Sequence, residues 1–198
     1  STRLILSAHD FHQRPADLLQ RVEAMANEPY CSVIKLAWMA RSLRDNLEAF
    51  TLLEHRPKLM IALCMGEAGQ MSRILAKKYD AAGSFASLSQ EAGTAPGQVA
   101  IEKLKSLYRW DAQREATQLF GVIGWPVEHS LSPDLHNAGF DAAQYDGVYV
   151  PMPIPDAYEA FKATVGSLLD LPSLRFRGAS VTLPHKENLL RFVDEHDG

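Results

Sequence analysis

The chain has 198 residues, of which 46% are hydrophobic and 22% are charged, and its formal net charge is −4 at pH 7. This composition is typical of a soluble globular protein and supplies enough apolar side chains for a sizeable core. The slight acidic excess offers no basic surface for nucleic acid, and no apolar run is long enough to cross a bilayer.

Residues 1–108 alternate between short apolar runs and segments whose apolar positions recur at helical spacing. Near-continuous apolar runs are typical of strands buried on both faces, and the alternation predicts a parallel sheet with right-handed crossovers. Four strand-helix units are half of an eight-stranded β/α barrel, which typically needs roughly 250 residues. The predicted strands are 4–8, 31–37, 59–65 and 82–88, and the predicted helices are 15–26, 41–53, 69–78 and 98–108.

A polar segment over 109–117 interrupts this rhythm, after which the alternation restarts for three more units of parallel α/β structure. We therefore expect two domains, 1–112 and 118–198, joined by a linker over 113–117. The predicted strands of the second domain are 118–124, 147–151 and 178–182, and its predicted helices are 133–143, 157–169 and 185–195.

The two cysteines, Cys31 and Cys64, both lie in apolar segments and show no spacing typical of metal ligands. This pattern favours reduced core residues of a cytosolic protein. We therefore expect no metal site and a cytoplasmic location, or a plastid location if the chain comes from a plant.

Lys35 interrupts the apolar run 33–37. Burying an ammonium group is costly unless the group is paired or its pKa falls. A lysine held in an apolar interior loses its proton more readily and becomes a nucleophile towards carbonyl groups. The alternative is a lysine at a strand end that extends its side chain to water, and the pattern alone leaves both possibilities open.

His9 ends the preceding predicted strand, so a parallel barrel would place it at the same carboxyl-end mouth as Lys35. A neutral imidazole beside an amine and a bound carbonyl compound can move protons during imine formation and elimination. Alternatively, His9 and Asp10 form only a helix-capping pair.

Five motifs in the first half occur in this order: S-A-H-D-F-H-Q-R-P, V-I-K-L-A, C-M-G-E-A-G-Q-M-S-R-I, G-S-F-A-S and T-A-P-G-Q. Together they resemble type I 3-dehydroquinate dehydratase over residues 1 to about 108. The resemblance implies dehydration of 3-dehydroquinate to 3-dehydroshikimate through a Schiff base on Lys35, with His9 as the general acid and base. It implies further substrate-binding residues: Arg73 for the carboxylate, Thr94 and Gln98 in a closing loop, and Met65 and Phe85 packed nearby.

The chain departs from that family in extent, because it begins at what would be the fifth of eight strands. The family's earlier strands supply an acidic partner for the histidine and arginines that hold substrate hydroxyls, and no segment here replaces them. A half-barrel also leaves two strand edges unpaired. Thr94 stands where the family often has serine, which keeps the hydroxyl.

Two motifs mark the second half, G-x-x-G-W-P-V-E-H-S-L-S-P-x-x-H-N over 121–137 and V-T-L-P-H-K-E over 181–187. Ser130 and Ser132 precede a proline at a helix start, where hydroxyl groups and free N–H groups suit a polyol carboxylate, although they equally suit a simple helix cap. Lys186 begins a helix against the macrodipole, either for a functional reason or because water solvates it.

These two motifs closely resemble the substrate-binding domain of shikimate dehydrogenase over residues 118–198. The resemblance implies that Ser130 and Ser132 bind the substrate carboxylate and that Thr182 binds a ring hydroxyl. It also implies that Lys186 is catalytic and assists proton transfer at the carbonyl oxygen while NADPH delivers hydride. Ser180 stands where the family usually has asparagine.

The NADP-binding domain of that family, with the aspartate partner of the lysine, would follow Gly198, and no G-x-G-x-x-G turn occurs in the chain. NADP is therefore expected as a cofactor of the parent protein alone. The chain resembles an internal fragment, truncated at both ends, of a bifunctional shikimate-pathway enzyme, and we expect it to be inactive alone.

The expected partners are the small-molecule substrates 3-dehydroquinate and 3-dehydroshikimate or shikimate, without nucleic acid or a membrane. Two alternatives stay open. One is a non-catalytic ligand-binding or interaction module built of two incomplete domains. The other is Schiff-base chemistry on a different carbonyl substrate, as in a class I aldolase, which the serine pair and the Thr182 and Lys186 motif disfavour.

Overall fold

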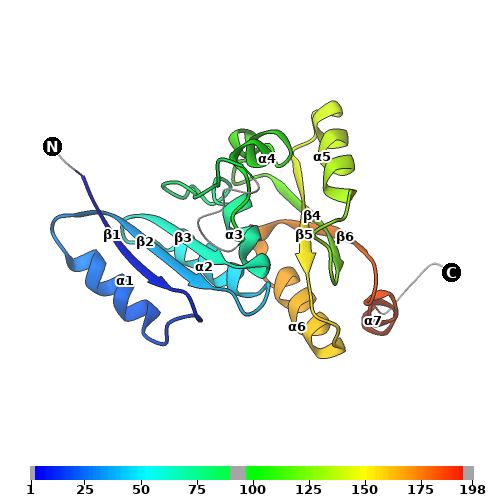
Figure 1. Ribbon diagram of the computed structural model, residues 1–198, viewed down its shortest axis with the longest axis horizontal. Coiled ribbons are helices and arrows are strands. Elements are labelled where there is room, and N and C mark those ends of the chain that lie inside the picture. Colours follow the sequence, from blue (N-terminus) through cyan, green and yellow to red (C-terminus); the bar gives the residue numbers. More distant parts are fainter. Residues whose placement is uncertain (1–2, 90–96, 194–198) are drawn as a thin grey trace.

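The computed structural model describes residues 3–89 and 97–193 of the chain. Figure 1 shows two α/β units side by side along the longest axis, one built from residues up to about 108 and the other from residue 118 onward. Each unit contains a three-stranded sheet in which every neighbouring pair of strands is parallel. The expected α/β class with parallel sheets is confirmed.

The first sheet has the strand order β1-β2-β3, so each strand lies beside the next one along the chain. Its register places Lys35 opposite Ser7 on one side and Ile61 on the other. The strands are β1 (Leu4–Asp10), β2 (Cys31–Met39) and β3 (Leu59–Met65), and the helices are α1 (Leu18–Asn27), α2 (Asp45–Glu54), α3 (Gln70–Ile74) and α4 (Ile101–Ser106), with the short 3-10 helix η1 (Glu67–Gly69) before α3.

The predicted fourth strand over 82–88 is wrong. This segment forms only an isolated bridge, in which Ser87 exchanges backbone hydrogen bonds with Val99 and Ile101 at 3.1 and 2.9 Å. Its larger apolar side chains are also incompletely buried, since Phe85 is 40% exposed and Leu88 is 89% exposed. The described residues therefore give the first unit three paired strands, and a half-barrel of four paired strands is not observed.

The second sheet has the order β5-β4-β6, with β4 in the centre. This order arises because the chain adds β5 on one side of β4 and then crosses over to add β6 on the other side. Its three strands and three helices overlap the predicted segments. They are β4 (Gln118–Gly124), β5 (Gly147–Pro153), β6 (Phe176–Val181), α5 (Ser132–Ala142), α6 (Tyr158–Leu169) and α7 (Lys186–Phe192).

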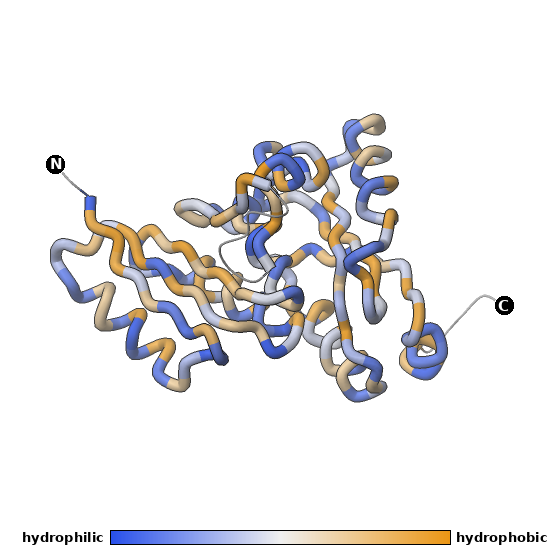
Figure 2. The backbone as a smooth tube through the Cα atoms, in the orientation of Figure 1, coloured by the Kyte–Doolittle hydropathy of each residue, from blue (hydrophilic) through white to orange (hydrophobic). Residues whose placement is uncertain are grey.

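One buried apolar cluster extends through both units. It includes Met71 and Ile74 of α3 together with Val150 and Met152 of β5. Figure 2 shows hydrophobic residues concentrated along the strands, with hydrophilic residues recurring along the helices. The two units therefore share an apolar interface, and burial of that surface favours their association.

The segment between the units is fastened to both of them. The Trp110 indole N–H of the 3-10 helix η2 (Trp110–Ala112) donates to the Arg73 carbonyl at 3.3 Å. Further along, Arg114 and Thr117 both contact the Asp146 carboxylate, at 2.9 and 2.8 Å. Residues 110–117 are thus hydrogen-bonded to both units.

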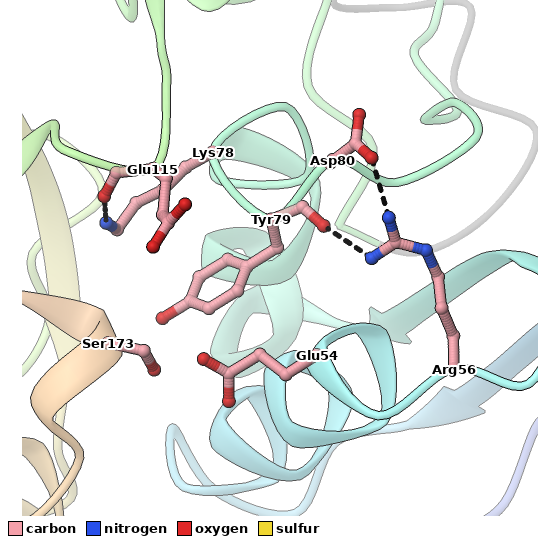
Figure 3. A pocket seen from close by; sticks show the side chains of 7 residues that line it. All are labelled: Glu54, Arg56, Lys78, Tyr79, Asp80, Glu115 and Ser173. Carbon is pink, nitrogen blue, oxygen red and sulfur yellow. Dashed lines mark hydrogen bonds and ion pairs between the residues drawn. The ribbon is translucent and has the colours of Figure 1, made fainter.

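A cavity of about 340 Å³ lies at this junction (Figure 3). The buried Lys78 ammonium donates to the Glu115 carbonyl at 2.6 Å, and Arg56 pairs with Asp80 at 2.6 Å. Burial lowers the pKa of Lys78 to about 8. Both cations of the cavity wall are thus already paired with groups of the protein. We therefore interpret this cavity as a structural feature of the junction and not as a binding site.

Candidate active sites

A cavity of about 240 Å³ opens at the carboxyl ends of the first three strands. Parallel register and the period of two along each strand place alternate side chains on the face that it covers. Six residues that the sequence analysis singles out lie around it. They are His9, Lys35, Met65, Arg73, Phe85 and Gln98, joined by Phe11, Ala37 and Leu63.

Lys35 is half-buried in this cavity and packs on an aromatic ring, with Nζ 3.7 Å from the centroid of Phe85. Burial lowers the pKa of Lys35, and the neighbouring Arg73 charge lowers it further. A lowered pKa increases the fraction of neutral amine at a given pH, which is the form that attacks a carbonyl carbon. The environment is therefore suited to a nucleophilic lysine.

His9 reaches the cavity from the end of β1, where it pairs in register with Ala37 of β2. Burial lowers its pKa, and the charge of Lys35 adds to the effect. The imidazole is thus held preferentially neutral, and a neutral ring can both accept and donate a proton. His9 and Lys35 therefore line the same cavity.

Arg73 enters the cavity from α3 and is only 2% exposed. Its Nη1 donates to the Phe85 carbonyl at 3.1 Å, while its buried Nε has no hydrogen-bond partner among the described residues. Burial lowers the pKa of this guanidinium. A buried cation that lines a cavity favours an anionic ligand, and a carboxylate matches the planar donor geometry of a guanidinium.

The rim of this cavity depends on a close backbone approach. Gly97 has a φ of +71°, and a Cβ there would overlap the backbone of Gly66, which itself has a φ of +82°. Only glycine combines that conformation with that contact, and it leads the chain to Gln98 on the cavity wall. Thr94, also predicted for this loop, lies outside the described residues.

A second cavity, of about 350 Å³, lies at the carboxyl end of β4 in the other unit. It is lined by Ser130 just before α5, by Ser132 at the first position of α5, and by Thr182 after β6. The Ser132 N–H donates to the Ser130 hydroxyl at 3.3 Å, and the Thr182 N–H donates to the Ile123 carbonyl at 2.9 Å. Its wall also includes Ser180, Val122, Pro126, Val127 and His129.

Lys186 is not among the residues that line this second cavity. It is exposed at the start of α7, directly after the turn formed by Thr182 and the buried His185. The His185 ring contacts the Ile154 carbonyl at 2.7 Å, which holds that turn against the end of β5. The second cavity therefore offers hydroxyl groups to a ligand, and the Lys186 ammonium lies outside its wall.

Some lining residues carry no signal of their own in the sequence. Phe11 and Leu63 are ordinary apolar residues, and only the strand register, which pairs Leu63 with Ala37, could have identified Leu63. His129 adjoins the serine pair and could have been included on position alone. In both units the chemically distinctive residues were predictable, whereas the apolar walls were not.

Cys31 and Cys64 are both buried free thiols, as predicted, and burial raises the pKa of Cys64. Within 3–89 and 97–193, no group of three or more histidine, cysteine, aspartate or glutamate side chains could hold a metal ion. No helix in those same ranges has the length and apolar character needed to span a membrane.

Comparison with known proteins assigns each unit. The family model of type I 3-dehydroquinase matches residues 1–115, and that of the shikimate dehydrogenase substrate binding domain matches residues 122–198. The "Bifunctional 3-dehydroquinate dehydratase/shikimate dehydrogenase, chloroplastic" of Arabidopsis thaliana is 33% identical over 196 residues. These residues are 98% of this chain and 31% of that protein, so the chain spans about a third of this relative.

Two further proteins are similar to part or nearly all of this chain. The "Shikimate dehydrogenase (NADP(+))" of Rubrobacter xylanophilus is 48% identical over 81 residues, 41% of this chain and 27% of that protein. A solved structure of dehydroquinate dehydratase and shikimate dehydrogenase from S. pombe AroM is 30% identical, with a TM-score of 0.41, covering 97% of this chain and 36% of that one. The chain therefore belongs to the type I 3-dehydroquinase family, and it joins that family's fold to a shikimate dehydrogenase substrate binding domain.

Proposed function

We propose that the full-length protein catalyses two consecutive steps of the shikimate pathway. The first unit dehydrates 3-dehydroquinate to 3-dehydroshikimate, and the second takes part in the NADPH-dependent reduction of 3-dehydroshikimate to shikimate. The observation that carries this proposal is the convergence of Lys35, His9 and Arg73 on one cavity. An amine of lowered pKa, an imidazole and a buried guanidinium match a substrate that has both a ketone and a carboxylate.

In the proposed first step, neutral Lys35 attacks the ketone carbon, and loss of water forms an imine. The imine makes the neighbouring C–H bond acidic. Removal of that proton and departure of the hydroxyl group one carbon further on, as water, create the double bond. Hydrolysis of the imine then consumes one water, releases 3-dehydroshikimate and restores the free amine.

His9 is proposed to move the protons of this sequence, because it is kept preferentially neutral beside the amine. Arg73 is proposed to bind the carboxylate through its guanidinium group, which lines the cavity. Met65, Phe85 and Gln98 form the wall against which the ring is held. Thr94 is assigned to the closing loop from the motif alone.

In the proposed second step, the Ser130 and Ser132 hydroxyls bind the carboxylate and Thr182 binds a ring hydroxyl. Lys186 is proposed to move a proton at the substrate oxygen, which requires α7 or a bound substrate to bring its amine to the cavity. No strand-to-helix turn of this unit has a Gly-x-Gly-x-x-Gly sequence, so these residues do not fit a dinucleotide and we derive no step at the cofactor.

The finer organisation is likewise proposed. We assign residues 1–112 to the carboxyl-terminal half of a β/α barrel, 113–117 to a linker and 118–198 to the substrate domain. We assign NADP to the full-length protein, small-molecule substrates as its partners, and the cytoplasm as its location.

Covalent trapping tests the first step most simply. The full-length protein is incubated with 3-dehydroquinate and sodium borohydride, and the modified residue is identified by peptide mass spectrometry. We expect a reduced adduct on Lys35, none in Lys35→Ala, and normal trapping in the control Lys58→Ala, whose amine contacts the Glu28 carbonyl instead. An adduct that persists in Lys35→Ala would refute the assignment, and shikimate binding without turnover of either substrate would favour a non-catalytic module.

A further inference from the structure

Each candidate site lies next to a buried asparagine that the proposed chemistry does not use. Asn46 of α2 is 0% exposed, and Asn137 of α5 is 2% exposed. A buried carboxamide is costly unless its donors and acceptor are hydrogen-bonded, and both of these are fully engaged with backbone groups. In each case the bonded backbone belongs partly to a different element of the fold.

Asn137 links α5 to the edge of the second sheet. Its Oδ1 accepts the Tyr149 N–H at 2.9 Å, and its Nδ2 donates to the Tyr149 carbonyl at 2.8 Å. Because β5 is an edge strand of the order β5-β4-β6, the carboxamide occupies the place that a neighbouring strand would take. The same Nδ2 donates to the Pro133 carbonyl at 2.8 Å.

This arrangement determines where α5 begins. Pro133 lies in the first turn of α5, directly after Ser132 and three residues after Ser130. The two serines line the second cavity. The carboxamide of Asn137 thus ties the serine pair, through Pro133, to a defined point on β5.

Asn46 has the corresponding role in the first unit. Its Oδ1 accepts the Ser72 N–H at 2.8 Å, while its Nδ2 donates to the carbonyls of Leu43 and Ala68 at 2.7 and 2.6 Å. The Ser72 hydroxyl in turn accepts the Cys64 N–H of β3 at 2.8 Å. These bonds lock the start of α3 between α2 and β3.

Arg73 is the residue directly after Ser72, so the same bonds determine where its guanidinium enters the first cavity. Neither asparagine is among the residues that line these two cavities. Each one instead contacts a neighbouring turn, and that turn carries the proposed carboxylate-binding group.

We propose that Asn46 and Asn137 are positioning residues, each of which places the carboxylate-binding group of one site, Arg73 and the Ser130–Ser132 pair respectively. This inference rests on the proposed function. Each asparagine therefore affects binding of the substrate carboxylate in its own unit and does not affect binding in the other unit. Replacement by the isosteric aspartate removes both N–H donors and sets a carboxylate against two carbonyl oxygens.

The test uses full-length protein with Asn46→Asp and Asn137→Asp, and it measures the two reactions separately. Asn46→Asp is expected to raise the KM for 3-dehydroquinate about tenfold and leave the KM for shikimate within about twofold. Asn137→Asp is expected to do the reverse, so each variant serves as the matched control of the other. Asn46→Ser and Asn137→Ser replace any aspartate variant that fails to fold.

A second measurement separates positioning from stability. Shikimate and its methyl ester are compared as substrates of the reverse reaction, because the ester lacks the carboxylate charge. Asn137→Asp is expected to lose most of the preference for shikimate, whereas Asn46→Asp keeps it. Variants that raise the KM equally in the two reactions, or that lower Tm and leave both KM values unchanged, would overturn the inference. A wild-type protein that turns over neither substrate would instead refute the proposed function, on which the inference depends.

Discussion

Replacement of Arg73 by lysine and by methionine separates two effects of this buried guanidinium on the first site. The side chain donates one hydrogen bond to the Phe85 carbonyl and lines the cavity. Arg73→Lys keeps the charge and removes the planar pair of donors. A lost hydrogen bond to a charged group costs about 1.5–3 kcal/mol, which corresponds to a rise of about 10–100-fold in the KM for 3-dehydroquinate.

Arg73→Met also removes the charge, which changes the pH dependence. Arg73 is the second cause, after burial, that lowers the pKa of Lys35. Its removal therefore raises that pKa, so that a higher pH is needed to obtain the neutral amine. We expect the acidic limb of the kcat/KM profile to move to higher pH in Arg73→Met and to stay in place in Arg73→Lys.

The assay follows 3-dehydroshikimate formation by the ultraviolet absorbance of its conjugated double bond, across a series of pH values. Arg56→Lys is the matched control, because Arg56 pairs with Asp80 at the junction and does not line the first cavity. An unchanged KM in both Arg73 variants would contradict the carboxylate-binding role. An acidic limb that moves equally in both variants would contradict the electrostatic coupling to Lys35.

Three further predictions concern the rim, the second site and the junction. Gly97→Ala should raise the KM for 3-dehydroquinate, because its Cβ would overlap the Gly66 backbone, whereas the control Gly83→Ala meets only ordinary contacts. Ser132→Ala should raise the KM for shikimate about tenfold in steady-state assays, and an unchanged value would remove Ser132 from the site. The pKa of Lys78, about 8, lies below its unfolded value, so the unfolded state binds more protons between pH 8 and 10.5. The stability of the wild type should therefore rise over that window relative to Lys78→Met in denaturant titrations, and parallel curves would contradict this.

The paired strands were predictable because near-continuous apolar runs identify strands of a buried parallel sheet. The segment 82–88 resembles such a run, but the backbone hydrogen bonds of Ser87 go to residues 99 and 101. The local sequence pattern does not show these partners. The helix expected over 69–78 is shorter, with α3 ending at Ile74, and Lys78 beyond it donates to Glu115 across the junction. That contact depends on tertiary structure alone.

The candidate sites show the same division. Lys35 and Arg73 are chemically conspicuous in apolar surroundings, and the structure brings both into one cavity. Lys186 was equally conspicuous, but helix geometry leaves it outside the wall of the second cavity. The proposed role of Asn46 and Asn137 was not predictable from the sequence, because it depends on their hydrogen bonds to backbone groups of other elements.

The proposed function is that one polypeptide catalyses two consecutive reactions, a dehydration and then a reduction of the product. Its most direct test supplies full-length protein with NADPH and either 3-dehydroquinate or 3-dehydroshikimate, and follows NADPH oxidation together with shikimate formation. The proposed function predicts one NADPH consumed per shikimate formed from either substrate, and it predicts that Lys35→Ala abolishes only the reaction that starts from 3-dehydroquinate. Loss of both reactions in a folded Lys35→Ala protein, or loss of neither, would contradict it.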